Sequence, residues 1–349
     1  MRIYVTWPTP FEPWLERRHH GGNYQQAFHY FHGLQAAFHP DVPVIWNSWN
    51  IPIADVASGD WLISHPAFDI AGADNRNVVR SVLERGVKVG YITNDCLYSY
   101  PWTVGYYDRH GYRGFDNCGL NRCDPDPDGT NAFCKAQCVE YAQAQFVLSH
   151  ANRRAIHLWQ HDDPSIALKK TILANAGVNF TPVIAPTDKA ALPREVFNSR
   201  RKKFLVYSGE HHLKQQQQFK RLCPNETLEM GSVNWFHPAT YKHVIDTSSF
   251  AVSCSLQEAE PYFGLECMSK GLLLVGGEDW YQAPEELTWR HAADGSTDKS
   301  NWEKIMFLCS DDPRVEEIYN DQMDRFHQDS ANTWPCFISI LKEKILSSR

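Results

Sequence analysis

Short apolar segments alternate with helical patterns along this chain, and that alternation constrains the fold more than any other feature. Apolar runs typical of β-strands occur at 2–7, 42–46, 61–64, 87–93 and 146–149. Apolar residues spaced three and four apart predict helices at 23–38, 77–85 and 164–176. Strands that alternate with helices form a parallel sheet covered by helices on both faces. The first half of the chain is therefore predicted to be an α/β domain.

The same alternation starts again after a proline-marked stretch at 182–193. Strands are predicted at 203–208, 250–253 and 272–275, and helices at 215–222, 241–247 and 266–270. The 349 residues are enough for two domains of roughly 100–200 residues each. We predict an N-terminal Rossmann-like domain at 1–185, a second at 186–330, and a helix within 331–349 that packs back across their junction.

Composition narrows the class of protein. The net charge of −7 argues against a general binder of nucleic-acid backbones. The first residues lack the pattern of a signal peptide, and no window approaches the apolar length of a membrane span. Ten cysteines without an export signal favour thiols in a reducing compartment. We therefore expect a soluble, cytoplasmic protein.

The stretch from Ser255 to Gly277 carries the most informative pair of acidic residues. Glu258 and Glu266 are separated by seven residues and follow the strand predicted at 250–253. Open α/β sheets bind ligands beyond the carboxyl ends of their strands. A carboxylate there can accept hydroxyl protons from a ribose or a sugar, and the free N–H groups of a helix start, which we place at Glu266, suit a diphosphate. Exposed surface carboxylates are the plain alternative.

This stretch resembles the E-x7-E segment of the large retaining glycosyltransferase family numbered four. Residues 265–271, LECMSKG, are similar position for position to that family's Leu-Glu-Ala-Met-Ala-x-Gly. The resemblance implies a GT-B fold, in which two Rossmann-like α/β domains face a cleft. It also implies that Glu266 binds the donor ribose and that Glu258 lies near the transferred sugar as a catalytic group. The family's Gly-Phe-Gly directly follows its first Glu, whereas here Phe263, Gly264 and Leu265 directly precede the second; we assign these three to donor binding.

Other stretches resemble the family in the same order along the chain. Gly21 and Gly22 resemble its N-terminal glycine-rich loop, where glycine lets the backbone approach a phosphate. His65, after the strand at 61–64, resembles a strand-end histidine near the reacting sugar, and Asp95 ends a stretch similar to Thr-x-His-Asp. The resemblance thus makes His65 and Asp95 catalytic candidates. The plain alternatives are a helix entry, a strand end and a turn cap.

The phosphate-binding loop resembles the family less closely. After the strand at 203–208, Gly209 and Lys214 match the family's glycine and phosphate-binding lysine, but Glu210 replaces its arginine and the loop is one residue shorter. Lys214 is the candidate phosphate cation, with a solvated surface lysine as the alternative. A second donor to the diphosphate would come from His211, His212 or Arg201.

Four cysteines form a cluster that the family lacks, inside a predicted insertion at 105–140: Cys118, Cys123, Cys134 and Cys138. Two close pairs of thiolates can converge on zinc, and two disulfides or unligated loop thiols are the alternatives. Asp124, Asp126 and Asp128 imitate the start of a calcium loop, but Lys135 stands at its twelfth position. A polar turn between the pairs therefore fits better than calcium. We expect a structural zinc that orders this insertion beside the acceptor.

The resemblance implies transfer of a hexosyl or pentosyl group from a UDP- or GDP-sugar to a hydroxyl acceptor, with retention and without a metal or other cofactor required for catalysis. A nucleotide-sugar epimerase or phosphorylase of the same fold is one alternative. A catalytically inactive relative that binds sugar nucleotides is another. The acceptor stays open among glycans, lipid-linked sugars, proteins and modified nucleic-acid bases.

Overall fold

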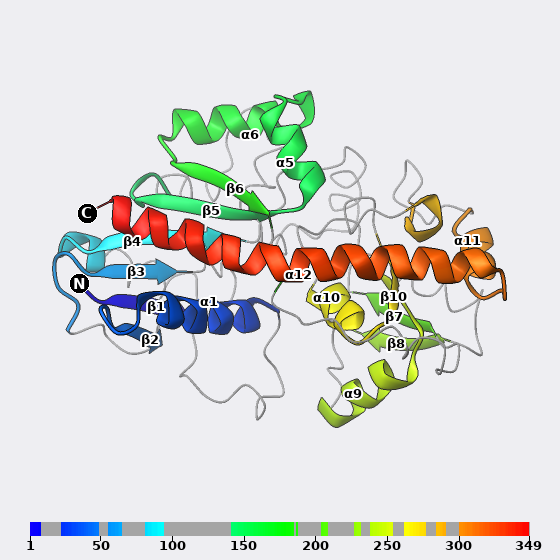
Figure 1. The fold of residues 1–349 in the computed structure, drawn as a ribbon. Helices are drawn as coiled ribbons and strands as arrows, with labels where there is room; N and C mark the ends of the chain where they lie inside the picture. Colours follow the sequence, from blue (N-terminus) through cyan, green and yellow to red (C-terminus); the bar gives the residue numbers. More distant parts are fainter. Residues whose placement is uncertain are drawn as a thin grey trace. The chain divides into compact units, whose positions relative to one another are not determined.

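The computed structural model describes residues 1–7, 22–48, 55–64, 81–93, 141–184, 186–187, 204–208, 227–231, 238–253, 262–276, 284–290 and 300–348. These residues divide into two compact units. Unit 1 contains the described residues up to 184 together with 335–348, and unit 2 contains those from 186 to 334. Each unit is built on its own parallel sheet (Figure 1).

The sheet of unit 1 has six strands in the order β2-β1-β3-β4-β5-β6. The strands are β1 (Ile3–Trp7), β2 (Val44–Ser48), β3 (Trp61–Ser64), β4 (Lys88–Thr93), β5 (Phe146–Ala151) and β6 (Phe180–Ile184). Every neighbouring pair is parallel. All six strands therefore present their carboxyl ends at one edge, where open α/β sheets bind ligands.

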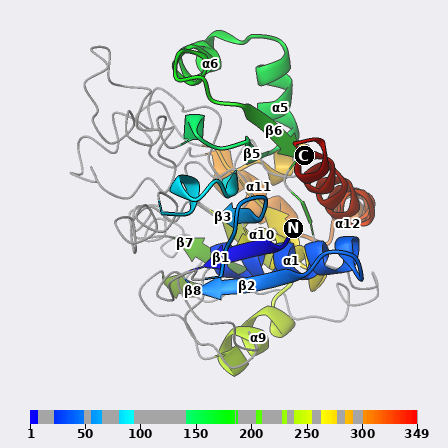
Figure 2. The same ribbon diagram turned by 90° about the vertical axis from the view of Figure 1, so that its left-hand side faces the viewer.

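Helices pack against both faces of this sheet. On one face, Tyr30 of α1 (Gly22–Phe38) contacts His150 of β5 and Phe337 of the last helix. Figures 1 and 2 show α5 (Arg153–Gln160) and α6 (Pro164–Asn175) lying beside β5 and β6. Leu173 of α6 packs into the apolar cluster on the other face, with side chains from four strands: Tyr4, Leu62, Val89, Tyr91 and Val147.

A buried carboxylate ties the start of β1 to the turn before β3. Asp60 is 4% exposed and accepts hydrogen bonds from the backbone N–H of Arg2 at 2.8 Å, from its guanidinium at 2.8 and 3.1 Å, and from the N–H of Ala57 at 3.0 Å. Burial opposes ionisation of this carboxyl, but the hydrogen bonds from Ala57 and Arg2 outweigh it. The pKa of Asp60 therefore lies below its ordinary value.

Asp60→Asn is expected to destabilise unit 1 by about 1.5–3 kcal/mol, because the amide cannot accept all of these hydrogen bonds. When the pKa of a carboxyl is lower in the folded state than in the unfolded state, the ionised group stabilises the fold at pH values above the unfolded pKa. This stabilisation is lost as the pH falls through the folded pKa. Chemical denaturation should therefore show a difference in the free energy of unfolding between wild type and variant at neutral pH, and this difference should become smaller in acid. The exposed neighbour provides a control, Asp55→Asn, and equal stability losses in the two variants would contradict this account.

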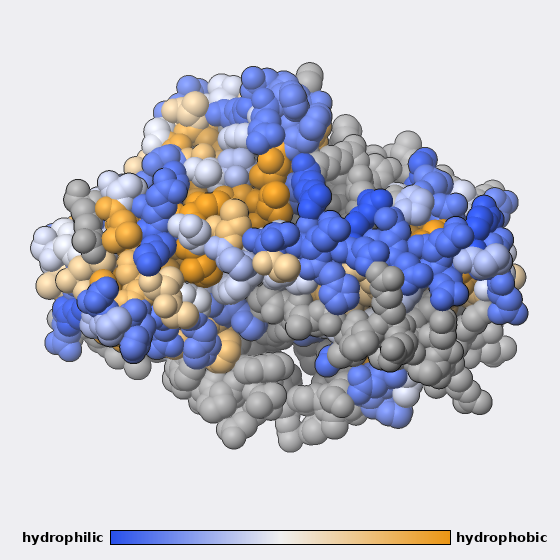
Figure 3. All heavy atoms as spheres, viewed as in Figure 1, coloured by the Kyte–Doolittle hydropathy of each residue, from blue (hydrophilic) through white to orange (hydrophobic). Residues whose placement is uncertain are grey.

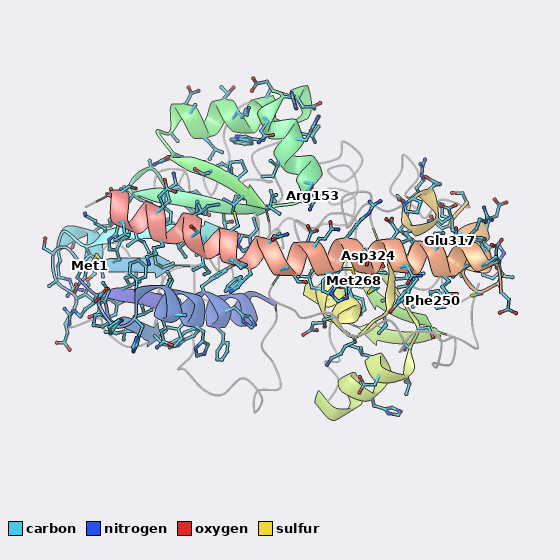
Figure 4. All side chains as sticks on the ribbon, viewed as in Figure 1. Met1, Arg153, Phe250, Met268, Glu317 and Asp324 are labelled. Carbon is cyan, nitrogen blue, oxygen red and sulfur yellow. The ribbon has the colours of Figure 1, made fainter. Side chains whose placement is uncertain are left out.

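Unit 2 has a four-stranded parallel sheet in the order β10-β9-β7-β8. Its strands are β7 (Phe204–Ser208), β8 (Thr227–Gly231), β9 (Phe250–Ser253) and β10 (Leu273–Val275). Its helical elements are α9 (Pro238–Thr247), α10 (Tyr262–Ser269), η4 (Glu285–Leu287) and α11 (Ser300–Leu308). Phe250 of β9 and Met268 of α10, labelled in Figure 4, lie in one buried apolar cluster. Trp289 and Phe326 complete that core.

The last helix, α12 (Pro313–Ser347), is 35 residues long. The division between the units falls within it, between Trp334 and Pro335. Its first part packs on unit 2 and presents mostly hydrophilic surface in Figure 3, with exposed charges such as Glu317 (Figure 4). In its last part, Lys342 donates to the carbonyl oxygen of Ala37 in unit 1 at 2.7 Å. None of the described helices has both the length and the apolar character that crossing a membrane requires.

Most predicted elements in the described ranges are confirmed, and two strands, 61–64 and 250–253, have the predicted bounds. Strand β6 was not predicted, and Pro182, at the start of the proline-marked stretch, lies inside it. β6 is an edge strand, and an edge tolerates proline because one side of the strand forms no ladder. The predicted helix at 215–222 lies outside the described residues.

Candidate active site

The carboxyl edge of the unit 2 sheet is the first part of the candidate site. β7 and β9 are neighbours, with Tyr207 paired to Ser253, so both strands end at the same edge. The chain leaves β9 after Ser253 and re-enters the described structure at Tyr262, where α10 begins. Gly209 and Glu258, which follow these strand ends in the sequence, lie outside the described residues.

Helix α10 carries a single charged residue. Phe263, Leu265, Cys267 and Met268 are each at most 8% exposed and belong to the core of unit 2. Glu266 is half-buried, and its carboxylate is the one charged side-chain group in this helix. An acceptor-only carboxylate of this kind suits a ligand with two neighbouring hydroxyl groups.

The predicted helix start at Glu266 was wrong, because α10 begins four residues earlier at Tyr262. The apolar side chains of Phe263 and Leu265 pack into the core, so the helix gains a turn before Glu266. The first four N–H groups of a helix have no partner within it. In α10 the first turn contains Phe263, Gly264 and Leu265, the three residues predicted to bind the donor, and the amides of Phe263 and Gly264 are among these first four. Glu266 and these amides are therefore within one turn of each other.

A glycine turn joins α10 to β10. Gly271 has φ of +75°, in the left-handed region that favours glycine. Its N–H donates to the carbonyl of Met268 at 2.9 Å, and the N–H of Leu272 donates to that of Cys267 at 3.0 Å. β10 begins directly afterwards, at Leu273. The position of Glu266 thus depends on how β10 is held in the sheet.

Cys267 is adjacent to Glu266 in the helix but offers no nucleophile. Its side chain is fully buried. Burial, and then the negative charge of Glu266, raise the pKa of this thiol well above its ordinary value. The thiol therefore stays protonated at neutral pH, and the thiolate, which is the reactive form, does not appear there. Within α10, charge for binding or catalysis comes from Glu266.

Buried hydroxyl groups mark the corresponding edge of unit 1. Four strands carry a serine or threonine near their carboxyl end on one face of the sheet, and each is at most 1% exposed: Thr6, Ser64, Thr93 and Ser149. The register pairs Thr6 with Ser64, and Thr93 with Ser149. This sequence signal was missed, although a hydroxyl residue lies at or next to the end of each of these apolar runs. The predicted His65 and Asp95 follow Ser64 and Thr93 by one and two residues.

The structure describes only part of the predicted site. Gly22 begins α1, and Phe263, Gly264, Leu265 and Glu266 lie together on α10. The other predicted residues lie outside the described ranges: Gly21, His65, Asp95, Gly209, His211, Lys214, Glu258, Cys118, Cys123, Cys134 and Cys138. Among the residues described, no group of three or more His, Cys, Asp or Glu side chains could hold a metal ion.

Comparison with known proteins identifies the fold. No protein-family model matches the chain, and no curated protein matches it either. The sucrose-phosphate synthase of Thermosynechococcus elongatus superposes with a TM-score of 0.53 at 11% identity, over 100% of both chains. The crystal structure of TarM superposes with a TM-score of 0.50 at 8% identity, over 82% of this chain and 55% of TarM, so the chain spans about half of TarM's length. At these identities the likeness shows the fold alone: the predicted α/β fold of the GT-B class is confirmed.

Proposed function

We propose that the chain is a glycosyltransferase that takes a sugar from a UDP- or GDP-sugar and transfers it to a hydroxyl acceptor with retention. The observation that carries this proposal is the placement of Glu266. It lies half-buried on a helix that follows the carboxyl end of β9, directly after the first turn of that helix, residues 262–265. The fold agrees with it, since one structure with a similar fold is named a sucrose-phosphate synthase.

In the proposed donor site, a charged side chain and neutral backbone groups bind different parts of the donor. The Glu266 carboxylate accepts hydrogen bonds from the ribose hydroxyls. The amides of Phe263 and Gly264 carry the partial positive charge of the helix start, which suits the diphosphate, and we assign Leu265 to donor binding beside them. We assign Gly209, His211 and Lys214 to the same diphosphate, Gly21 and Gly22 to donor binding, and Glu258 to the transferred sugar.

Stabilisation of the leaving group supplies most of the proposed catalysis. As the bond between sugar and diphosphate breaks, positive charge grows on the sugar and negative charge on the phosphate. Each well-placed donor aimed at that phosphate lowers the barrier by about 3–4 kcal/mol. His65 and Asp95 would then meet the acceptor hydroxyl, and Lys214 and the backbone amides would supply the positive charge that a metal ion provides in other transferases.

A thermal-shift screen of nucleotides tests donor binding. A ligand that binds only the folded protein at 100 times its Kd stabilises it by about 2.7 kcal/mol. We expect UDP or GDP to raise the melting temperature clearly, and CMP and inorganic phosphate to raise it little. A screen in which no nucleoside diphosphate raises the melting temperature would contradict the proposed donor.

We also propose a structural zinc held by Cys118, Cys123, Cys134 and Cys138. Thiolates are preferred zinc ligands, and two close pairs give the four ligands of a tetrahedral site. Cys134→Ser is expected to release the metal and lower the melting temperature, because binding of a structural zinc contributes directly to folding. Elemental analysis of the purified wild type checks this, with Cys336→Ser as the matched control because Cys336 lies on α12. A wild-type protein without zinc would remove the proposal.

A further inference from the structure

Strand β10 is a short edge strand that needs a partner on its open side. It has three residues, and it pairs only with β9 among the described strands. In a parallel ladder, successive residues direct their backbone groups to opposite sides. Leu273 directs its N–H toward β9, where the carbonyl of Ser249 accepts it at 3.0 Å. The N–H and the carbonyl of Leu274, which is 2% exposed, therefore face the open side.

Gln322 of α12 fills that open side. Its Oε1 accepts the N–H of Leu274 at 2.8 Å, and its Nε2 donates to the carbonyl oxygen of Leu274 at 2.8 Å. The Gln322 side chain is buried, with the residue 2% exposed. One side-chain amide thus makes the two hydrogen bonds that another strand would make, and both backbone groups of Leu274 are satisfied.

We infer that Gln322 is a positioning residue for the donor site, an inference that rests on the proposed function. Only Lys270, Gly271 and Leu272 separate α10 from β10. Because hydrogen bonds fix both ends of this turn, a shift of β10 moves α10 with it. Gln322 therefore sets the position of Glu266 and of the first-turn amides without touching the nucleotide.

Asn301 of α11 provides a matched comparison within unit 2. Its Nδ2 donates to the carbonyl of Arg290 at 2.8 Å, its Oδ1 accepts the N–H of Arg290 at 3.0 Å, and it is 2% exposed. Asn301 thus makes to Arg290 the same pair of hydrogen bonds that Gln322 makes to Leu274. Arg290, however, follows η4 and is not joined to α10 by a turn. Its neighbour Trp289 donates to the carbonyl of Gly276, which follows β10 at the end away from the turn to α10. We therefore expect loss of the Asn301 pair to cost stability with little effect on the position of α10.

The test compares Gln322→Met with Asn301→Leu, two apolar replacements of similar size. UDP and GDP affinities are measured by calorimetry at a temperature where both variants are folded. We expect Gln322→Met to weaken nucleotide binding about tenfold, which corresponds to about 1.4 kcal/mol. Asn301→Leu should change it by less than about twofold, or about 0.4 kcal/mol. Equal affinities in the two variants would overturn the positioning role.

Gln322→Glu adds a readout that simple loss of packing does not produce. A neutral carboxylic acid can accept from the Leu274 N–H and donate to its carbonyl, as the amide does, whereas an ionised carboxylate cannot donate. Burial beside that carbonyl should raise the pKa of the new carboxyl. A carboxyl whose pKa is raised in the folded state stabilises the fold at low pH. This stabilisation is lost as the pH rises through the folded pKa. The melting temperature and the nucleotide affinity of this variant, each relative to wild type, should therefore recover on acidification.

The outcomes separate the inference from the proposed function. Suppose that the wild type binds nucleotide, but that the melting temperature and the nucleotide affinity of Gln322→Glu, each relative to wild type, do not change with pH. The positioning role is then overturned and the donor site stands. If the wild type binds neither UDP nor GDP, the proposed function is overturned and the positioning role with it. Recovery of both properties in acid, together with wild-type affinity in Asn301→Leu, supports the inference.

Discussion

Glu266→Ala is expected to weaken binding of the nucleotide donor by about tenfold to 150-fold. A hydrogen bond to a charged group contributes about 1.5–3 kcal/mol, and each 1.4 kcal/mol is a factor of ten in Kd. The carboxylate is half-buried, while the core side chains of α10 come from its neighbours. The folded structure should therefore survive the substitution. Calorimetric titration with UDP and GDP measures the loss directly.

The matched control for this prediction is Glu317→Ala. Glu317 is exposed on α12, so its removal deletes the same side chain from unit 2 without touching α10 (Figure 4). We expect the control to bind nucleotide as the wild type does. Donor affinity that is unchanged in Glu266→Ala, or reduced to the same degree in both variants, would exclude a direct contact between Glu266 and the donor.

Gly90→Ala is expected to destabilise unit 1 by about 3 kcal/mol, near the upper end of the usual cost of overpacking a core. Gly90 of β4 is paired with Phe146 of β5. A Cβ at this position would lie 2.6 and 2.8 Å from ring carbons of Phe146, closer than real Cβ contacts. The Phe146 ring cannot yield easily, because it is buried against Trp61 at a centroid distance of 5.7 Å. Chemical denaturation measures the difference.

A second substitution identifies the cause of that loss. Phe146→Leu removes the ring atoms that the new methyl group would meet. The double variant Gly90→Ala, Phe146→Leu should therefore lose less stability than the sum of the two single losses, since contacting residues couple. Strictly additive losses would show that the cost of Gly90→Ala arises from the backbone and not from the Phe146 ring.

Much of the fold could be predicted because it depends on local patterns. The apolar runs at 61–64 and 250–253 became β3 and β9, and the helix predicted at 164–176 became α6. The long α12 was predicted only within 331–349, because residues 313–330 are rich in charged side chains. Their helix is stabilised by a few buried side chains such as Met323 and Phe326, which pack against strands distant in the sequence.

The candidate site was predictable where a compact motif carries it. Residues 265–271 pointed to Glu266, and the structure places that residue on a helix after the carboxyl end of β9. Gln322 could not be found in this way. It lies 48 residues from Leu274, and nothing in its neighbourhood distinguishes it from the exposed Gln328 on the same helix. Its role follows from the packing of α12 on the edge of β10, which is a tertiary property.

The most direct test of the central claim follows the donor itself. The protein is incubated with a panel of UDP- and GDP-sugars and a mixture of hydroxyl acceptors, and phosphorus and proton NMR record the products. The account predicts release of UDP or GDP and appearance of the sugar on an acceptor, or slowly on water, with the anomeric configuration of the donor. Sugars that remain attached to their nucleotides, whether unchanged or epimerised, would contradict it.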